Sequence, residues 1–155
     1  MIFRRDAFIN HALTFRYTKD IINKDNVRYR PRVEIRLSNK QNNFKLAMLV
    51  DSGADISLIP LEVAEILELE LRDKIKSSSA SESFETWESA VNAELIKGNN
   101  KTYNLGRMEI RVPTKKIHEK NLNSHALLGR SPFFNKFDIT FRENIFKLIL
   151  RKPKK

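Results

Sequence analysis

An alternation of apolar and charged side chains across residues 32–37 constrains the fold more than any other feature of this sequence. The apolar positions are Val33, Ile35 and Leu37, and the charged ones are Arg32, Glu34 and Arg36. A period of two is typical of a β-strand with one buried face. Polar residues 38–43 supply a turn, and residues 44–50 form a second strand that is continuously apolar from Leu46. The pattern predicts a hairpin whose second strand enters the core.

Further strands are predicted along the rest of the chain. Residues 91–96 and 103–112 flank a turn at 97–100 that contains a glycine, and 139–141 with 145–150 form a closing hairpin. A short strand is expected at residues 57–59. The chain is therefore expected to be mainly β.

Two short helices complete the expected elements. Pro60 suits a helix start, with apolar residues at helical spacing through Glu68. Ser131 resembles an N-cap before Pro132, which predicts a helix over residues 132–137. The Ser-rich, polar residues 73–90 are expected to form a mobile hairpin or loop.

The formal charge of +10 lies at the two ends of the chain. Residues 1–32 and residues 147–155 each carry a net +5, whereas residues 33–146 are neutral. Basic ends can touch nucleic acid, but a solvated terminus is the commoner explanation, and the neutral body has no basic stripe. Nucleic acid is therefore expected as a partner only through the basic termini, if at all.

Several classes of protein are disfavoured by composition. No apolar run approaches the ~18 residues that span a bilayer, so no membrane span is expected. The absence of Cys fits a reducing compartment, and a cytoplasmic location is expected. His11, His118 and His125 lack metal-ligand spacing and are interpreted as surface residues, so neither a metal nor another cofactor is predicted.

The residue most suggestive of chemistry is Asp51, which ends the buried strand and begins the run Val50-Asp51-Ser52-Gly53-Ala54-Asp55. A carboxylate placed there is unusual, because burial raises its proton affinity. Taken alone, Asp-Ser-Gly is typical of a turn in which the aspartate caps the backbone.

A second motif changes this interpretation. About 75 residues after Asp51 comes Leu127-Leu128-Gly129-Arg130 with a short helix behind it, followed by Phe137-Asp138-Ile139-Thr140-Phe141 and a closing strand. Together with the hairpin that leads into Asp51, these segments resemble the retropepsin-like aspartic proteases, the family of retroviral proteases and their cellular relatives. The resemblance covers about residues 29–150. It divides the chain into a basic N-terminal extension (1–28), a protease domain (29–150) and a basic tail (151–155).

The resemblance implies a small, closed, β-barrel-like domain with one or two short helices, and an obligate homodimer. Aspartic proteases use two carboxylates that share one proton. The motif occurs once in this chain, so each subunit would contribute one Asp51. The implied activity is that of an aspartic endopeptidase acting on a peptide or protein substrate, with a water activated by the Asp51/Asp51 dyad.

The family also implies roles for the neighbours of Asp51. Ser52 and Gly53 would support the catalytic loop, and Ala54 and Asp55 would bind substrate. Arg130 would pair with Asp55 and fix the loop to the following helix.

One departure from the family concerns the flap that closes over substrate. Family flaps are usually Gly-rich, whereas residues 54–97 contain no glycine. The segment around residues 77–89 is the candidate flap, and Phe84 or Trp87 could provide an apolar lid contact or belong to the core. A non-catalytic dimerisation or peptide-binding module that keeps the fold is therefore the alternative function.

Overall fold

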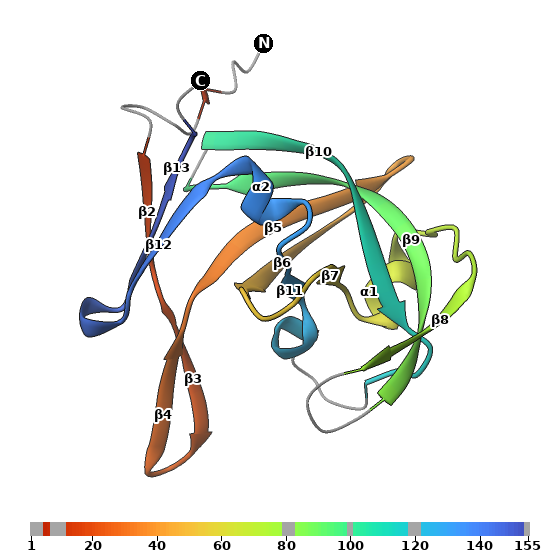
Figure 1. The fold of residues 1–155 in the computed structure, drawn as a ribbon, viewed down its shortest axis with the longest axis horizontal. Helices are drawn as coiled ribbons and strands as arrows, with labels where there is room; N and C mark the ends of the chain where they lie inside the picture. The colour runs from red at the N-terminus through yellow and green to blue at the C-terminus, as the bar shows by residue number, and fades with distance from the viewer. Residues whose placement is uncertain (1–4, 7–11, 79–82, 99–100, 118–121, 154–155) are drawn as a thin grey trace.

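A computed structural model describes residues 5–6, 12–78, 83–98, 101–117 and 122–153. Six strands close into a barrel (Figure 1). They are β5 (Arg32–Asn39), β6 (Asn42–Val50), β7 (Ser57–Leu58), β9 (Ser83–Ile96), β10 (Lys101–Pro113) and β11 (Leu127–Leu128). Their order is β10-β7-β11-β6-β5-β9, and pairing of β9 with β10 completes the ring. The expected closed, mainly β domain is confirmed.

The predicted alternation decides which side chains fill the barrel. On β5 the apolar positions are buried and Glu34 is exposed, as the period of two requires. From Leu46 to its end, β6 also alternates between buried and half-buried positions. The inward side chains of these two strands and of β10 are Val33, Ile35, Leu37, Leu46, Met48, Val50, Met108, Ile110 and Val112. The hairpins predicted at residues 32–50 and 91–112 are thus confirmed.

A second sheet of three strands lies beside the barrel (Figure 1). It contains β12 (Asp138–Arg142), β13 (Lys147–Arg151) and β2 (Ala12–Arg16), with β13 in the centre. The closing hairpin is therefore confirmed. The N-terminal segment, predicted to be a basic extension of the domain, supplies β2, which pairs antiparallel with β13 and buries Leu13 and Phe15.

Two shorter hairpins extend from these sheets. Strand β3 (Thr18–Asn23) pairs only with β4 (Asn26–Arg30) among the described residues, and the expected boundary at residue 28 falls inside β4. Strand β8 (Lys74–Ser78) pairs with the first part of β9, so the Ser-rich segment forms a hairpin; its residues 79–82 lie outside the described residues. A two-residue strand, β1 (Arg5–Asp6), pairs with β10.

The helical elements are short. They are α1 (Leu61–Ile66), α2 (Phe133–Lys136), η2 (Leu122–His125) and η3 (Glu143–Ile145). The expected N-cap at Ser131 is wrong, because Pro132 holds that position and no side chain caps the helix. The Ser131 N–H instead donates to the carbonyl oxygen of Asp55, 2.9 Å away, which ties this residue to the Asp51 loop. Within the described part of the chain, no helix is long and apolar enough to cross a membrane.

Candidate active site

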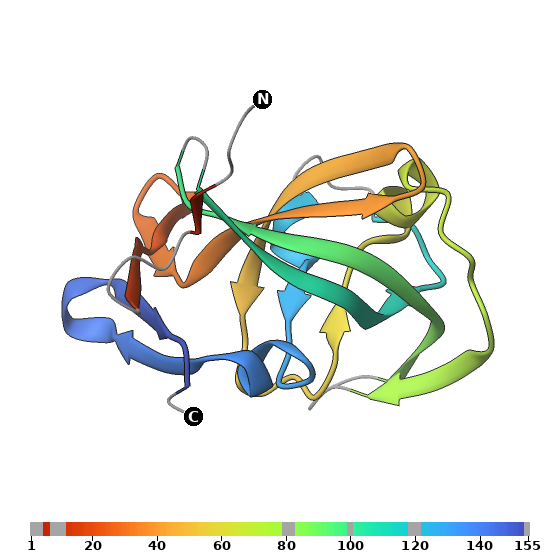
Figure 2. The ribbon, with the colours of Figure 1, turned by 90° about the horizontal axis from the view of Figure 1, so that it is seen from above.

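The candidate site is the loop of residues 51–56, which joins β6 to β7 at one end of the barrel (Figure 2). The chain does not pair β6 directly with β7, because β11 lies between them. Leu127 of β11 lies beside Leu49 of β6 in parallel register and beside Leu58 of β7 in antiparallel register. The two motifs found in the sequence are thereby brought into contact, although about 75 residues separate them.

Backbone hydrogen bonds fix the position of Asp51 from both sides. The Asp51 N–H donates to the carbonyl oxygen of Leu128 at 3.0 Å. One residue earlier, the Val50 N–H donates to the carbonyl oxygen of Pro31 at 2.8 Å. Because these bonds join it to two different strand ends, the backbone at Asp51 is held in a fixed position at the end of the barrel.

The Asp51 side chain is half-buried, whereas Ser52, Gly53 and Asp55 are exposed. Its Oδ1 accepts a hydrogen bond from the Gly53 N–H at 2.9 Å, so the turn-capping interaction expected of Asp-Ser-Gly is present. A Cβ at position 53 would lie 3.2 Å from the same Oδ1, which is closer than ordinary contact. A larger residue at position 53 would therefore press on the carboxylate.

Gly129 provides the closest packing in the site. A Cβ at this position would lie 2.6 Å from the backbone C and O of Ile56 and 2.8 Å from the carbonyl oxygen of Ala54. The Gly129 N–H donates to Oγ of Ser57, a fully buried side chain, at 3.1 Å. Ser57 is a supporting residue that the sequence reasoning missed; its only signal is a small hydroxyl within an otherwise apolar strand.

The Asp55–Arg130 pair forms, but it is open to solvent. Arg130 Nη1 lies 3.7 Å from Asp55 Oδ1, with the two side chains 65% and 90% exposed. Such exposed pairs contribute little to stability. The link between the loop and the chain before α2 is carried by the backbone, because the Arg130 N–H donates to the carbonyl oxygen of Ala54 at 2.7 Å.

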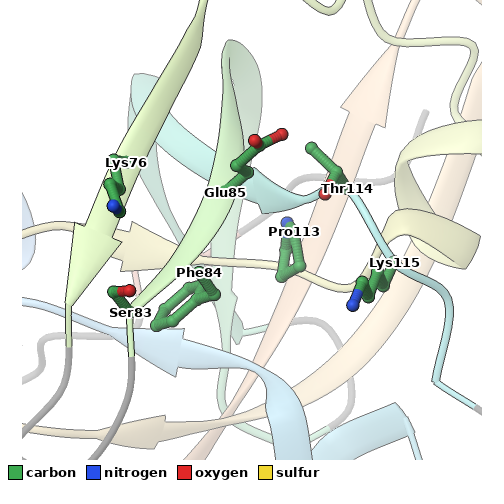
Figure 3. Close-up of a pocket in the computed structure, with 7 residues that line it drawn as sticks. All are labelled: Lys76, Ser83, Phe84, Glu85, Pro113, Thr114 and Lys115. Carbon is green, nitrogen blue, oxygen red and sulfur yellow. The ribbon is translucent and has the colours of Figure 1, made fainter.

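The two candidate flap aromatics occupy different surroundings. Phe84 lines a cavity of about 520 Å³ toward the turn end of the β8–β9 hairpin (Figure 3). Its walls are Lys76, Ser83, Phe84, Glu85, Pro113, Thr114 and Lys115. Trp87 packs against the hydrophobic core, and Lys74 Nζ lies 4.8 Å from the centre of its ring. Phe84 therefore faces a space that a ligand could enter.

Within the loop of one chain, Asp51 is the half-buried carboxylate, whereas Asp55, its other acid, is exposed and lies beside Arg130. General acid–base hydrolysis needs one group that accepts a proton and a second that donates one. In the described residues, no cluster of three His, Cys, Asp or Glu side chains could hold a metal ion. His11 and His118 lie outside the described residues.

Comparison with known proteins identifies the family. A model of the aspartyl protease family matches residues 33–131, which span both motifs. No curated protein sequence matches the chain. Among solved structures, a retropepsin-like aspartic protease from Rickettsia conorii is 16% identical, covers 91% of this chain and 90% of its own, and superposes with a TM-score of 0.56. The protease of EIAV, solved in complex with the inhibitor HBY-793, is 20% identical over 68% of this chain and 86% of its own, with a TM-score of 0.41. The family match covers more than half of the sequence, and the chain therefore belongs to the aspartyl protease family and has a retropepsin-like fold.

Proposed function

We propose that this protein is an aspartic endopeptidase that acts as a homodimer, with one Asp51 from each subunit forming the catalytic dyad. The observation that carries the proposal is the Asp51 loop itself. Backbone bonds to Leu128 and Pro31 hold it at the barrel end, its apex is exposed, and the motif occurs once per chain. A pre-positioned carboxylate that lacks its chemical partner is what half of a two-fold symmetric site requires.

In the dimer, the two carboxylates would share one proton. The ionised member accepts a proton from a water molecule, whose oxygen attacks the peptide carbonyl carbon, while the protonated member donates to the carbonyl oxygen. Collapse of the tetrahedral intermediate then breaks the C–N bond. The carboxyl that took the proton from water gives it to the leaving nitrogen, and the other carboxylate takes a proton from a hydroxyl of the intermediate, which restores the shared proton. Because the mechanism needs one carboxyl protonated and the other ionised, the cleavage rate should rise and then fall as the pH is increased.

Each remaining member of the site has a task in this proposal. Ser52 and Gly53, at the exposed apex, would contact the partner loop and let it approach closely. Ala54 and Asp55 would line the substrate backbone, and Phe84 would contact substrate side chains from the β8–β9 hairpin.

The direct test is peptide cleavage by an Asp51→Asn variant, measured across about pH 3–7 with and without a statine-type transition-state mimic. Asn keeps the shape of the side chain and removes its acid–base function, so cleavage should fall by at least about 100-fold, the scale of general acid–base contributions. Asp138→Asn is the matched control, since it removes an exposed carboxylate from β12, outside the barrel, and should cleave at the wild-type rate. Undiminished cleavage by Asp51→Asn would refute the proposal.

A non-catalytic peptide-binding module is the second candidate, favoured by one observation. The β8–β9 hairpin belongs to a stretch, residues 54–97, that contains no glycine. Glycine gives a closing segment its conformational freedom, so a hairpin without it is stiffer. This candidate predicts that peptides bind, as measured by calorimetry, and that no cleavage occurs at any pH tested.

A further inference from the structure

The β3–β4 hairpin, called the arm here, extends away from the barrel (Figure 1). Among the described residues, its two strands pair only with each other. A two-stranded hairpin is at best marginally stable alone in water and needs further packing. The arm therefore calls for an additional stabilising contact.

One face of the arm is mainly apolar and open to solvent. The register places Ile21 opposite Val27 and Lys19 opposite Tyr29, so these four residues share a face, and Ile21, Val27 and Tyr29 are its apolar members. All three are exposed, and Ile21 is 71% exposed. The Tyr29 ring stacks on Phe146, also exposed, with ring centres 4.5 Å apart, which extends the apolar surface onto the β12–β13 connection. Grouped apolar side chains on a surface are typical of an interaction site.

The opposite face of the arm fixes its orientation. Arg32, a buried residue at the start of β5, donates to both carboxylate oxygens of Asp20, at 2.6 and 2.8 Å. Arg30 Nε lies 3.2 Å from the same carboxylate. A two-point hydrogen bond from a buried guanidinium is directional. The base of the arm is thus anchored to the barrel, and binding would not need to order it.

The arm also lies next to the Asp51 loop. Arg32 of β5 is in register with Leu49 of β6, and the carbonyl oxygen of Pro31 accepts the Val50 N–H. Going backwards from Pro31 the chain enters the arm, and going forwards from Val50 it enters the Asp51 loop. Because β5 and β6 are antiparallel, both segments leave the barrel at the same end. A partner chain that brings a second carboxylate to Asp51 would approach the end of the barrel from which the arm also extends.

We infer that the apolar face of the arm is a contact surface for a second copy of this chain and helps assemble the two-carboxylate site. This inference rests on the proposed function for the identity of the partner. Each subunit would bury Ile21, Val27 and Tyr29 against its partner, at an interface beside the paired Asp51 loops. The arm would thereby couple dimer formation to completion of the site.

The test is sedimentation velocity over a wide concentration range, comparing wild type with Ile21→Lys. Ile21 is mostly exposed in one chain, so the substitution should leave the fold intact, as circular dichroism would show. In the dimer it would bury a charge on each side, and the dimer Kd should rise at least about 30-fold, the effect of losing a binding hot spot. Val27→Lys, at the paired position, should act in the same way and guards against a folding defect specific to the first variant.

Ile66→Lys is the matched control, since Ile66 is 49% exposed on α1, away from the arm, and the charge change is identical. It should leave the dimer Kd at the wild-type value. A dimer as tight in both arm variants as in wild type would overturn the inference. So would equal weakening by Ile66→Lys, or a wild-type chain that stays monomeric at every concentration.

Activity separates this inference from the proposed function. If both hold, Ile21→Lys cleaves peptide only at high protein concentration, whereas Asp51→Asn dimerises like wild type and fails to cleave at any concentration. If Asp51→Asn cleaves normally while Ile21→Lys is monomeric, the arm is confirmed as an interface and the proposed dyad is wrong.

Discussion

Replacing Gly129 by Ala tests whether close backbone packing holds the Asp51 loop in place. The added Cβ would lie 2.6 Å from two backbone atoms of Ile56 and 2.8 Å from the carbonyl oxygen of Ala54. All three contacts are with backbone, so no side chain can rotate away. Either β11 or the Asp51 loop must move.

The size of the effect follows from what that movement disrupts. The hydrogen bonds from Arg130 N–H to Ala54 (2.7 Å) and from Gly129 N–H to Ser57 Oγ (3.1 Å) both cross this contact. Losing each of these hydrogen bonds lowers the free energy of unfolding by about 1 kcal/mol, and overpacking lowers it by roughly a further 1–3 kcal/mol. The expected loss of about 3–5 kcal/mol corresponds, at roughly 2–4 °C per kcal/mol for a chain of this size, to a Tm lowered by about 6–20 °C.

Thermal unfolding followed by circular dichroism measures this loss, with Gly106→Ala as the control. Gly106 has a positive φ of 75°, but no atom lies within 4 Å of a Cβ placed there. Its substitution should cost only the strain of the left-handed conformation, about 1–2 kcal/mol. If Gly129→Ala lowered Tm no more than Gly106→Ala, the packing argument would be refuted.

Two further predictions concern the supports of the loop and of the arm. Ser57→Ala leaves the Gly129 N–H without its buried acceptor and should cost about 1–3 kcal/mol in denaturant unfolding; an unchanged midpoint would contradict the role given to this hydroxyl. Hydrogen bonds from Arg32 lower the pKa of Asp20 below its ordinary value of 3.8, so the ionised carboxylate stabilises the folded state above that value, and the contribution is lost as the pH falls through the lowered pKa. Asp20→Asn should therefore be less stable than wild type near pH 7, and the difference should shrink below about pH 4; a difference in unfolding free energy that stays constant into strong acid would contradict this assignment.

The sequence predicts best where local periodicity and burial agree. Val33, Ile35 and Leu37 alternate because one face of their strand fills the barrel, so the hairpin could be identified without knowing its neighbours. Residues 12–17 also alternate, with Leu13 and Phe15 inward, yet the run is short and its pairing partner is β13 at the other end of the chain. Because the two strands lie at opposite ends of the sequence, the residues around β2 do not indicate which strand it pairs with.

The site was only partly accessible to the same reasoning. Asp51 and Gly129 were found because the resemblance joins two distant motifs, and the structure places them directly after two neighbouring strands, β6 and β11. Ser131 was expected to cap α2, but its backbone is committed to Asp55. Ser57 was not identified because the sequence does not distinguish a buried serine from an exposed one.

The arm shows why an apolar pattern alone does not locate a core. Ile21, Val27 and Tyr29 would ordinarily be assigned to an interior, whereas here they are exposed on the arm. Their exposure is explained if the interior they belong to forms only when two chains meet. On these proposals, three properties reside in separate residues: Gly129 and Ser57 would stabilise the loop within one chain, Ile21 would control assembly, and Asp51 would carry the chemistry. Unfolding, sedimentation and cleavage measure these properties independently. A single substitution that changed the stability, the dimer Kd and the cleavage rate together would show that loop, interface and catalysis form one cooperative unit.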